Sequence, residues 1–303
     1  MVYKKTIGRY IFEFINIVIM LAVAFACLAP ILHVFFASIS DPTKLSGHEG
    51  IILHPLGKAT LKGYLLVFRN PNITIGYLNT IFYVVVGTVI SMLLTIFGGY
   101  AFSRKNFLLR NHLMLFVSFT MLFNGGLIPT FMVVKALGLY DSRWAIIIPS
   151  AISVFNLVIM RTSFLQIPDS IEESAKLDGA NDFTILFRII LPVSKPILAT
   201  IAIFAAVYQW NSFQDVLIYV SRESLQPLQF VLYKYINQAN ALAMLIRNST
   251  GLSGDALRAL TTRQTPTSVR MTVSVIVVFP ILLVYPLFQR HFVKGIMIGS
   301  VKG

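Results

Sequence analysis

The sequence predicts an all-α membrane protein with six transmembrane helices, built as a single domain over residues 1–303. Hydrophobic residues make up 56% of the chain and charged residues only 12%, and the mean hydropathy is +0.76, which is typical of a membrane protein. Six apolar runs reach the roughly 20 residues that a helix needs to cross the hydrocarbon core. Basic residues flank these runs without forming a stripe interleaved with aromatics, so we expect membrane lipids and no nucleic acid as partners.

The first span is predicted at about residues 14–36. Lys4, Lys5 and Arg9 precede it, as basic residues precede a secretory signal. However, the apolar run is too long for a signal peptide and no small-residue cleavage site follows it, so we expect the span to be retained. Cys27, the one cysteine of the chain, lies within this run and is expected to pack there.

The remaining spans follow from the same length criterion. They are predicted at about residues 77–102, 113–134, 144–163, 197–219 and 271–289. Gly98 with Gly99, and the run from Asn124 to Pro129, interrupt two of these spans. Such residues either weaken a helix or permit close helix contact, and both are tolerated only where protein or a water-filled cavity covers the backbone.

The orientation follows from where the basic residues lie. On one side of the membrane they lie mostly in short segments beside the spans, as Arg104, Lys105 and Arg110 do. On the other side most of them are scattered through two long loops, at residues 37–76 and 220–270. Long loops cross a membrane with little regard to charge. We therefore predict that both termini are cytoplasmic and that residues 37–76 and 220–270 are outer loops.

A polar segment at residues 168–196, between the fourth and fifth spans, predicts a helical hairpin on the cytoplasmic side. Ser170 and Glu173 have the spacing of a capping box, so a helix is expected to begin there. Gly179 suits a left-handed helix end, and Asn181 can cap a second helix directly afterwards. In that helix Phe183, Phe187 and Ile190 are spaced to share one face. An apolar helical face outside the bundle is typical of a docking surface.

The hairpin also carries a specific pattern. Glu173, Ser174, Ala175, Gly179, Ile189, Leu191 and Pro192 resemble the EAA loop, E-A-A-x3-G-x9-I-x-L-P, of the membrane-spanning permease subunits of bacterial ABC importers. Asp178 and Ala180 complete a D-G-A form common in the carbohydrate branch, and Ser174 in place of alanine is the one departure. Asn124–Pro129, the pair Trp210–Asn211 and the C-terminal stretch from Tyr285 to Gly303 extend the similarity to the complex-oligosaccharide subgroup.

This resemblance implies a type I importer of the maltose type. The chain would pair with a second, homologous permease, and two copies of an ABC ATPase would bind the hairpins at residues that we expect to be Glu173, Ser174, Ala175, Asp178, Gly179, Ala180, Phe183, Phe187, Ile189, Leu191 and Pro192. A periplasmic or extracellular sugar-binding protein would deliver the solute. ATP and Mg²⁺ would belong to the ATPase, because this chain has no phosphate-binding loop of the G-x4-G-K-[ST] type.

Polar residues at membrane depth are the candidates for the solute pathway, because they are costly there unless they are paired or face water. Amides can bridge sugar hydroxyls and aromatic rings can stack on a pyranose. The candidates are Asn124, Asn156, Gln209, Trp210, Asn211, Gln214 and Asp215. Equally, Trp210 could anchor the helix end at the membrane interface and Asn211 could cap it. For Asn124 and Asn156 a hydrogen bond between helices is favoured over contact with a solute.

Catalytic chemistry has no basis in the sequence. The five histidines lack metal-ligand spacing, and we expect His33 to be a hydrogen-bonded packing residue. We therefore predict neither catalytic nor metal-binding residues and no cofactor in this chain. Asp215, an acid near the end of a late span, leaves a proton-coupled secondary transporter as an alternative. Within the importer class, a non-sugar solute remains a further alternative, because an EAA loop alone does not identify the solute.

Overall fold

The computed structural model describes residues 7–45, 48–123, 125–248 and 267–283. Within these ranges all the regular secondary structure is helical, as predicted. The chain divides into two compact units, one of residues 1–70 with 232–279 and the other of residues 71–231 with 280–303. Asn124 and the C-terminal stretch from residue 284 onward lie outside the described residues. The last part of the predicted sixth span therefore lies outside them as well.

The first unit contains α1 (Ile7–Ser38), α2 (Pro42–Leu45), α3 (Lys62–Phe68), most of α14 (Leu228–Asn248) and most of a helix at Thr267–Leu283. The side chains of α1 are apolar and mostly exposed, as expected of a helix that faces lipid. At its end, Ala37 packs with Leu45 and Ile52. His33 accepts a hydrogen bond from the Ile52 backbone at 3.0 Å, which confirms its predicted packing role.

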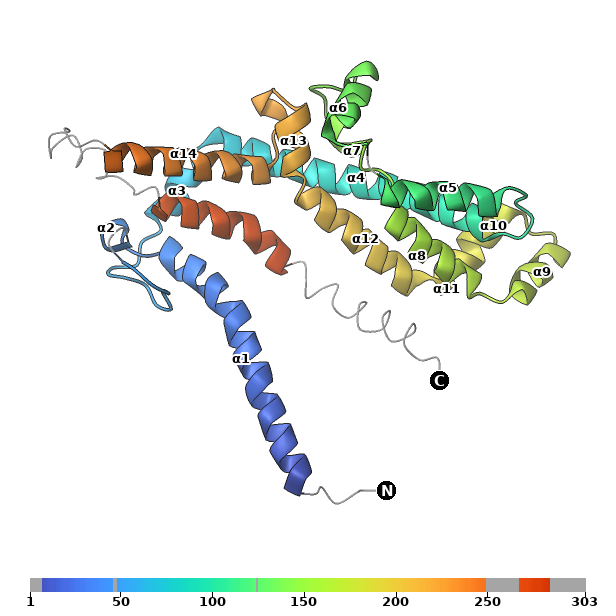
Figure 1. Cartoon of the computed structure of the whole chain (residues 1–303), viewed down its shortest axis with the longest axis horizontal. Coiled ribbons are helices and arrows are strands. Elements are labelled where there is room, and N and C mark those ends of the chain that lie inside the picture. The colour runs from blue at the N-terminus through green and yellow to red at the C-terminus, as the bar shows by residue number, and fades with distance from the viewer. Residues whose placement is uncertain (1–6, 46–47, 124, 249–266, 284–303) are drawn as a thin grey trace. The chain divides into compact units, whose positions relative to one another are not determined.

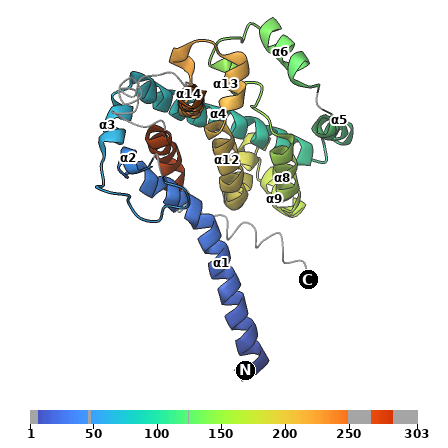
Figure 2. The same ribbon diagram turned by 60° about the vertical axis from the view of Figure 1, so that its left-hand side comes forward.

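The second unit is arranged around α4 (Pro71–Ser103). α8 (Val154–Leu165) and α12 (Lys195–Trp210) both pack along it, as two views show (Figures 1 and 2). Glycine permits this close contact. A Cβ atom at Gly99 would lie only 2.8 Å from the Cγ atom of Met160 on α8. Of the two roles that the sequence allows for this glycine, close helix contact is therefore the one found.

Three of the apolar segments predicted as spans are not continuous helices. Residues 113–134 form parts of α5 (Arg110–Leu122) and α6 (Leu127–Ala136), residues 144–163 form α7 (Trp144–Ile147) and most of α8, and residues 197–219 form most of α12 and then α13 (Phe213–Tyr219). Pro149 lies in the second break, where it cannot donate a backbone hydrogen bond. In the described part of the chain two helices, α1 and α4, are long and apolar enough to cross a membrane, or up to four segments if each bent pair is counted as one.

The hairpin at residues 168–196 consists of α9 (Asp169–Leu177), α10 (Asp182–Ile185), a π-helical turn η1 (Leu186–Ile190) and α11 (Leu191–Val193). Its buried side chains join those of the membrane helices: Ile185, Leu186 and Ile190 lie in one hydrophobic cluster with Tyr100 and other residues of α4, α8 and α12. Beyond α13, the short 3₁₀ helix η2 (Glu223–Leu225) packs on α4. The hairpin is therefore anchored to the second unit by its own core residues.

Candidate functional site

The tip of the hairpin is fixed by backbone hydrogen bonds around Gly179. This residue has φ = +82°, and the Gly179 and Ala180 amides donate to the carbonyls of Lys176 and Ala175 at 3.0 and 2.9 Å. These two bonds form the Schellman ending of α9, which glycine adopts with little strain. Asn181 then caps α10 by accepting a hydrogen bond from the Thr184 amide at 2.8 Å. Both predicted caps are confirmed.

Two predicted details of the hairpin are wrong. Helix α9 begins at Asp169 with Pro168 at its N-cap position, so Ser170 is not the cap. Pro168 ends the preceding segment with extended backbone, and this places the start of the helix two residues earlier. Ile190 does not share the exposed face of Phe183 and Phe187 but is fully buried. The π-helical turn at residues 186–190 shifts the helical phase, which a regular 3.6-residue period does not anticipate.

The residues predicted to couple to an ATPase divide between an exposed tip and an anchored base. Phe183 and Phe187 are 65% and 49% exposed, and Leu177 beside them is 90% exposed. Glu173, Ser174, Asp178 and Pro192 are also exposed. Ala175 is buried, and Ala180, Ile189 and Leu191 are partly buried. The Phe187 ring packs edge to face on Phe97 of α4, with centroids 6.3 Å apart, and is only partly free. Large exposed apolar side chains such as Leu177 and Phe183 are typical of a surface that binds another protein.

Charged side chains join the hairpin to the end of α4. Arg104 donates a hydrogen bond to Glu172, and Lys105 donates one to Asp169. The hydrogen bond from Lys105 lowers the pKa of the Asp169 carboxyl below its ordinary value. The side chains of both pairs line a groove of about 530 Å³ between the α4 end and α9.

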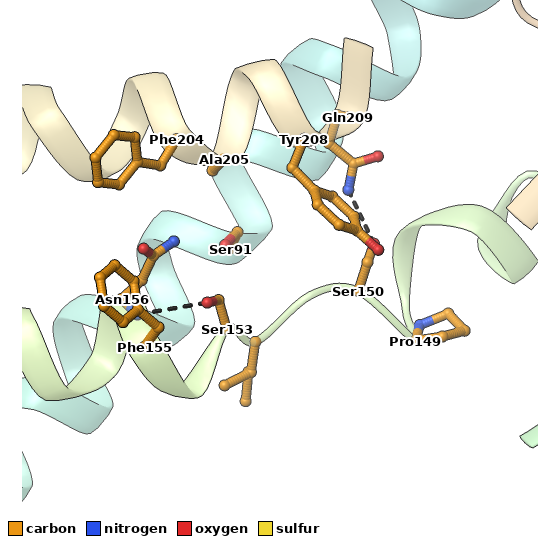
Figure 3. Close-up of a pocket in the computed structure, with 11 residues that line it drawn as sticks. Ser91, Pro149, Ser150, Ser153, Phe155, Asn156, Phe204, Ala205, Tyr208 and Gln209 are labelled. Atoms are coloured by element: carbon orange, nitrogen blue, oxygen red, sulfur yellow. Dashed lines mark hydrogen bonds between the residues drawn. The ribbon is translucent and has the colours of Figure 1, made fainter. Parts of the chain in front are cut away.

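A second feature is a pocket of about 570 Å³ between α4, α8 and α12, lined by both apolar and polar side chains (Figure 3). Of the predicted pathway residues, Asn156 and Gln209 both line it, and both are buried. The Gln209 amide donates a hydrogen bond to the Ser150 hydroxyl at 3.0 Å. Its carbonyl oxygen is buried without a hydrogen-bond partner among the described residues. The wall of the pocket therefore contains a buried amide whose acceptor forms no hydrogen bond within the described residues.

Gln214 and Asp215 line an adjacent pocket of about 420 Å³, which shares Ser150 and Tyr208 with the first one. The structure thus places four of the predicted pathway residues along two neighbouring pockets. Trp210 and Asn211 line neither pocket. The Asn211 amide donates to the carbonyl of Val207 at 2.8 Å, one turn earlier, as a residue that caps the helix end would. Asn124 lies outside the described residues.

Comparison with known proteins identifies the family. The model of the family described as "binding-protein-dependent transport system inner membrane component" matches residues 91–298. The chain belongs to this permease family. It is thus the membrane component of a transporter that works with a binding protein, and the resemblance found in the EAA loop is confirmed.

Several curated members of this permease family are similar over most of the chain. The polygalacturonan/rhamnogalacturonan transport system permease protein YtcP of Bacillus subtilis is 40% identical over 285 residues, which are 94% of this chain and 96% of the relative. Protein LplC of the same organism is 38% identical over 98% of this chain and 96% of its own length. The permease fold also matches a chain in the crystal structure of a bacterial ABC transporter involved in the import of the acidic polysaccharide alginate, with a TM-score of 0.83, 32% identity, and coverage of 96% of this chain and 99% of the other.

Sequence reasoning missed several residues that line the permease pocket. Ser91 comes from α4, Ser150 and Ser153 from the segment between α7 and α8, and Tyr208 from α12. Single serines in an apolar helix carry no pattern of their own. Tyr208 does carry a signal, because it adjoins Gln209 and an aromatic ring beside an amide is typical of sugar recognition.

Proposed function

We propose that this chain forms, together with a second homologous permease, the translocation pathway of an ATP-driven importer for an oligosaccharide. The observation that carries the proposal is the hairpin at residues 168–196, with its exposed apolar tip at Leu177, Phe183 and Phe187. Two copies of an ABC ATPase would hold this hairpin and its counterpart on the partner permease. Closure of the ATPases on ATP would move both hairpins as rigid bodies and switch the helix bundles between inward-facing and outward-facing states.

The pocket between α8 and α12 is the proposed contact with the solute in this subunit. Amides at Asn156 and Gln209 can bond pairs of hydroxyls, and the half-exposed rings of Phe155 and Tyr208 can stack on the apolar face of a sugar ring. Its volume of about 570 Å³ falls within the usual range of small-molecule sites. YtcP and the alginate importer are named for polysaccharides, which supports an oligosaccharide as the solute.

The proposed topology has six transmembrane helices, both termini in the cytoplasm of a bacterial cell, and outer loops at residues 37–76 and 220–270. The hairpin then faces the cytoplasm, where the ATPase and its ATP and Mg²⁺ are found. A periplasmic or extracellular binding protein would meet the opposite side. Cysteine labelling from outside the cell tests this arrangement, with a cysteine in place of the exposed loop residue Ala59 expected to react with an impermeant reagent and one in place of Ser170 expected not to react.

The docking proposal is tested at Gly179. A Cβ atom added at this position would meet no neighbour within 4 Å, but leucine is strained in the left-handed backbone, so Gly179→Leu should distort the tip alone. We expect this variant to insert into the membrane normally and to lose the co-purifying ATPase. Gly179→Asn should retain the ATPase, because asparagine tolerates the left-handed conformation.

Gly138 provides a matched control. It has φ = +69° with nothing within 4 Å, and its amide donates to the carbonyl of Lys135 in the same type of helix ending, after α6 and outside the hairpin. Gly138→Leu therefore carries the same backbone cost and should leave the ATPase bound. A normal amount of ATPase with Gly179→Leu, or an equal loss with Gly138→Leu, would count against docking at the hairpin.

A further inference from the structure

Arg104 directly follows the membrane helix α4 and connects it to the hairpin. Its guanidinium group donates hydrogen bonds to Glu172 on α9 and, at 3.4 Å, to the carbonyl of Phe164 on α8. Its Nε atom donates to the Ser103 hydroxyl at 3.0 Å, and its guanidinium carbon lies 4.8 Å from the centre of the Tyr100 ring. The fork of the arginine thus connects three helices at one point, which a lysine cannot do with the same geometry.

Glu172 is paired with two basic side chains. One of its carboxylate oxygens bonds Arg104 and the other lies 3.0 Å from the ammonium group of Lys176, one turn along α9. The Arg104 and Glu172 side chains are only 17% and 12% exposed. Little solvent screens this pair. Removing Glu172 would leave the Arg104 guanidinium without its carboxylate, and removing Arg104 would leave Glu172 paired only with Lys176 of its own helix.

The neighbouring pair of Lys105 and Asp169 joins the same two segments but differs in burial. Its side chains are 70% and 57% exposed. Exposed ion pairs contribute little because water and salt screen them. Two ion pairs, each between a basic residue after α4 and an acidic residue of α9, thus connect the two segments. Only the pair of Arg104 and Glu172 is buried enough to fix the position of α9 relative to the α4 end.

Apolar contacts continue the link from Arg104 into the membrane. The Tyr100 and Phe164 rings pack edge to face with centroids 6.5 Å apart, and Ala175 of α9 lies in the same cluster. One turn before Phe164, the Arg161 side chain donates to the carbonyl of Phe102 at 3.1 Å. The base of the hairpin, the end of α4 and the end of α8 therefore form one packed body.

We propose that Arg104 and Glu172 are positioning residues that make α4 move with the hairpin, so that force on the hairpin reaches the pathway. This inference rests on the proposed docking of the hairpin to an ATPase. It goes further in assigning the transfer of movement to one buried ion pair between two segments 68 residues apart. Lys105 and Asp169 have no such role.

The proposal is tested by measuring how tightly the hairpin is held to the α4 end in the assembled complex. After replacement of the single native cysteine, Cys27, spin labels at the exposed positions Asn106 and Ser170 report the distance between the two segments. The complex with its co-expressed permease and ATPase is measured without nucleotide and with ATP, so no sugar is needed. In the unmodified pair we expect one narrow distance distribution that stays the same in both states.

Arg104→Gln and Glu172→Gln should each widen that distribution at least about twofold, because each removes the buried ion pair between the α4 end and α9, and in Arg104→Gln the Glu172 carboxylate keeps only Lys176 of its own helix. Arg104→Lys should give a width between those of the unmodified protein and Arg104→Gln, since lysine keeps the charge but lacks the forked guanidinium group. Lys105→Gln is the matched control and should leave the width unchanged. If Arg104→Gln does not assemble, Glu172→Gln decides, because it changes the pair from the other side.

Widths for Arg104→Gln and Glu172→Gln equal to the unmodified width would overturn the proposal, and so would an equal widening in Lys105→Gln. The amount of ATPase in each preparation separates this result from the proposed function. If no ATPase accompanies the unmodified chain, docking itself fails. If ATPase is present and only the widths disagree, docking stands and the role of the ion pair fails.

Discussion

Replacement of Gln209 by leucine should separate a role in transport from a role in folding. Gln209 is 2% exposed. The hydrogen bond from its side-chain amide to Ser150 contributes about 0.5–1.5 kcal/mol of stability. Its carbonyl oxygen is a buried acceptor without a partner among the described residues, which costs about 1–3 kcal/mol. Leucine has a similar size and removes both terms. The net effect is therefore between about 0.5 kcal/mol destabilising and about 2.5 kcal/mol stabilising.

The remaining partner of Gln209 tolerates this change. The Ser150 hydroxyl also donates to the carbonyl of Ile146 at 2.8 Å, so the loss of Gln209 does not leave it without a hydrogen bond. Uptake should therefore be impaired even though the subunit is hardly destabilised or is stabilised. One lost hydrogen bond to a sugar hydroxyl, at about 0.5–1.5 kcal/mol, corresponds to a roughly 2- to 12-fold increase in the apparent KM.

Two measurements on the same preparation test this prediction: the thermal unfolding midpoint of the purified subunit, and uptake kinetics for an oligosaccharide that the binding protein captures. Gln166→Leu, at an exposed glutamine outside the pocket, is the control and should leave uptake unchanged. Gly87→Ala should impair uptake with Gln209 intact, because the new Cβ atom would lie 2.7 Å from the Gln209 amide and displace it. A Gln209→Leu protein that loses more than about 2 kcal/mol of stability and transports normally would refute the reasoning and make Gln209 a packing residue.

Two further predictions concern the supporting structure. Hydrogen bonds, first of all from the Arg222 amide, lower the pKa of the Asp141 carboxyl from 3.8. The contact therefore stabilises the loop above pH 3.8 and is lost as the pH falls below it. The Ser221 and Arg222 amides both bond Asp141 at 3.0 Å, so their protection against hydrogen exchange, measured relative to the intrinsic exchange rate at each pH, should fall there, and in Asp141→Asn it should already be lower at neutral pH. Protection that does not change with pH in the unmodified protein would contradict this. Gly99→Ala should destabilise the subunit by about 1–3 kcal/mol through overpacking against Met160, and Met160→Ala should therefore cost less stability in this variant than in the unmodified chain. Gly8→Ala, with open space around its Cβ position, should not destabilise the subunit, and a comparable loss there would show that helix contact is not the cause.

Local features of the hairpin could be predicted from sequence because they depend on a few adjacent residues. The left-handed backbone at Gly179 and the cap at Asn181 both follow from the preferences of those residue types. The π-helical turn at residues 186–190 could not be predicted in this way. Nothing in the run LFRII distinguishes it from ordinary helix, and the tertiary packing of Ile185 and Ile190 decides its geometry.

The ion pairs show why contacts across the fold resist the same reasoning. Arg104 and Lys105 are adjacent in the sequence, and their partners Glu172 and Asp169 are three residues apart. Both pairs satisfy the same charge rule. Only the fold sets one of them against Tyr100 and Phe164 and leaves the other in solvent. The pocket has the same origin, since Ser91, Ser150 and Gln209 meet there from separate segments.

The two candidate sites of this permease lie at opposite ends of the same helices. α12 begins at Lys195, directly after the hairpin, and reaches the pocket at Gln209, so its 16 residues span about 24 Å. α8 runs the opposite way in sequence, from Asn156 in the pocket to Phe164 beside Arg104. A tilt of the hairpin base therefore moves both walls of the pocket, whereas a tilt of the exposed tip alone moves neither. Tight packing at the base, around Tyr100 and Ile190, is thus a requirement for coupling as well as for stability.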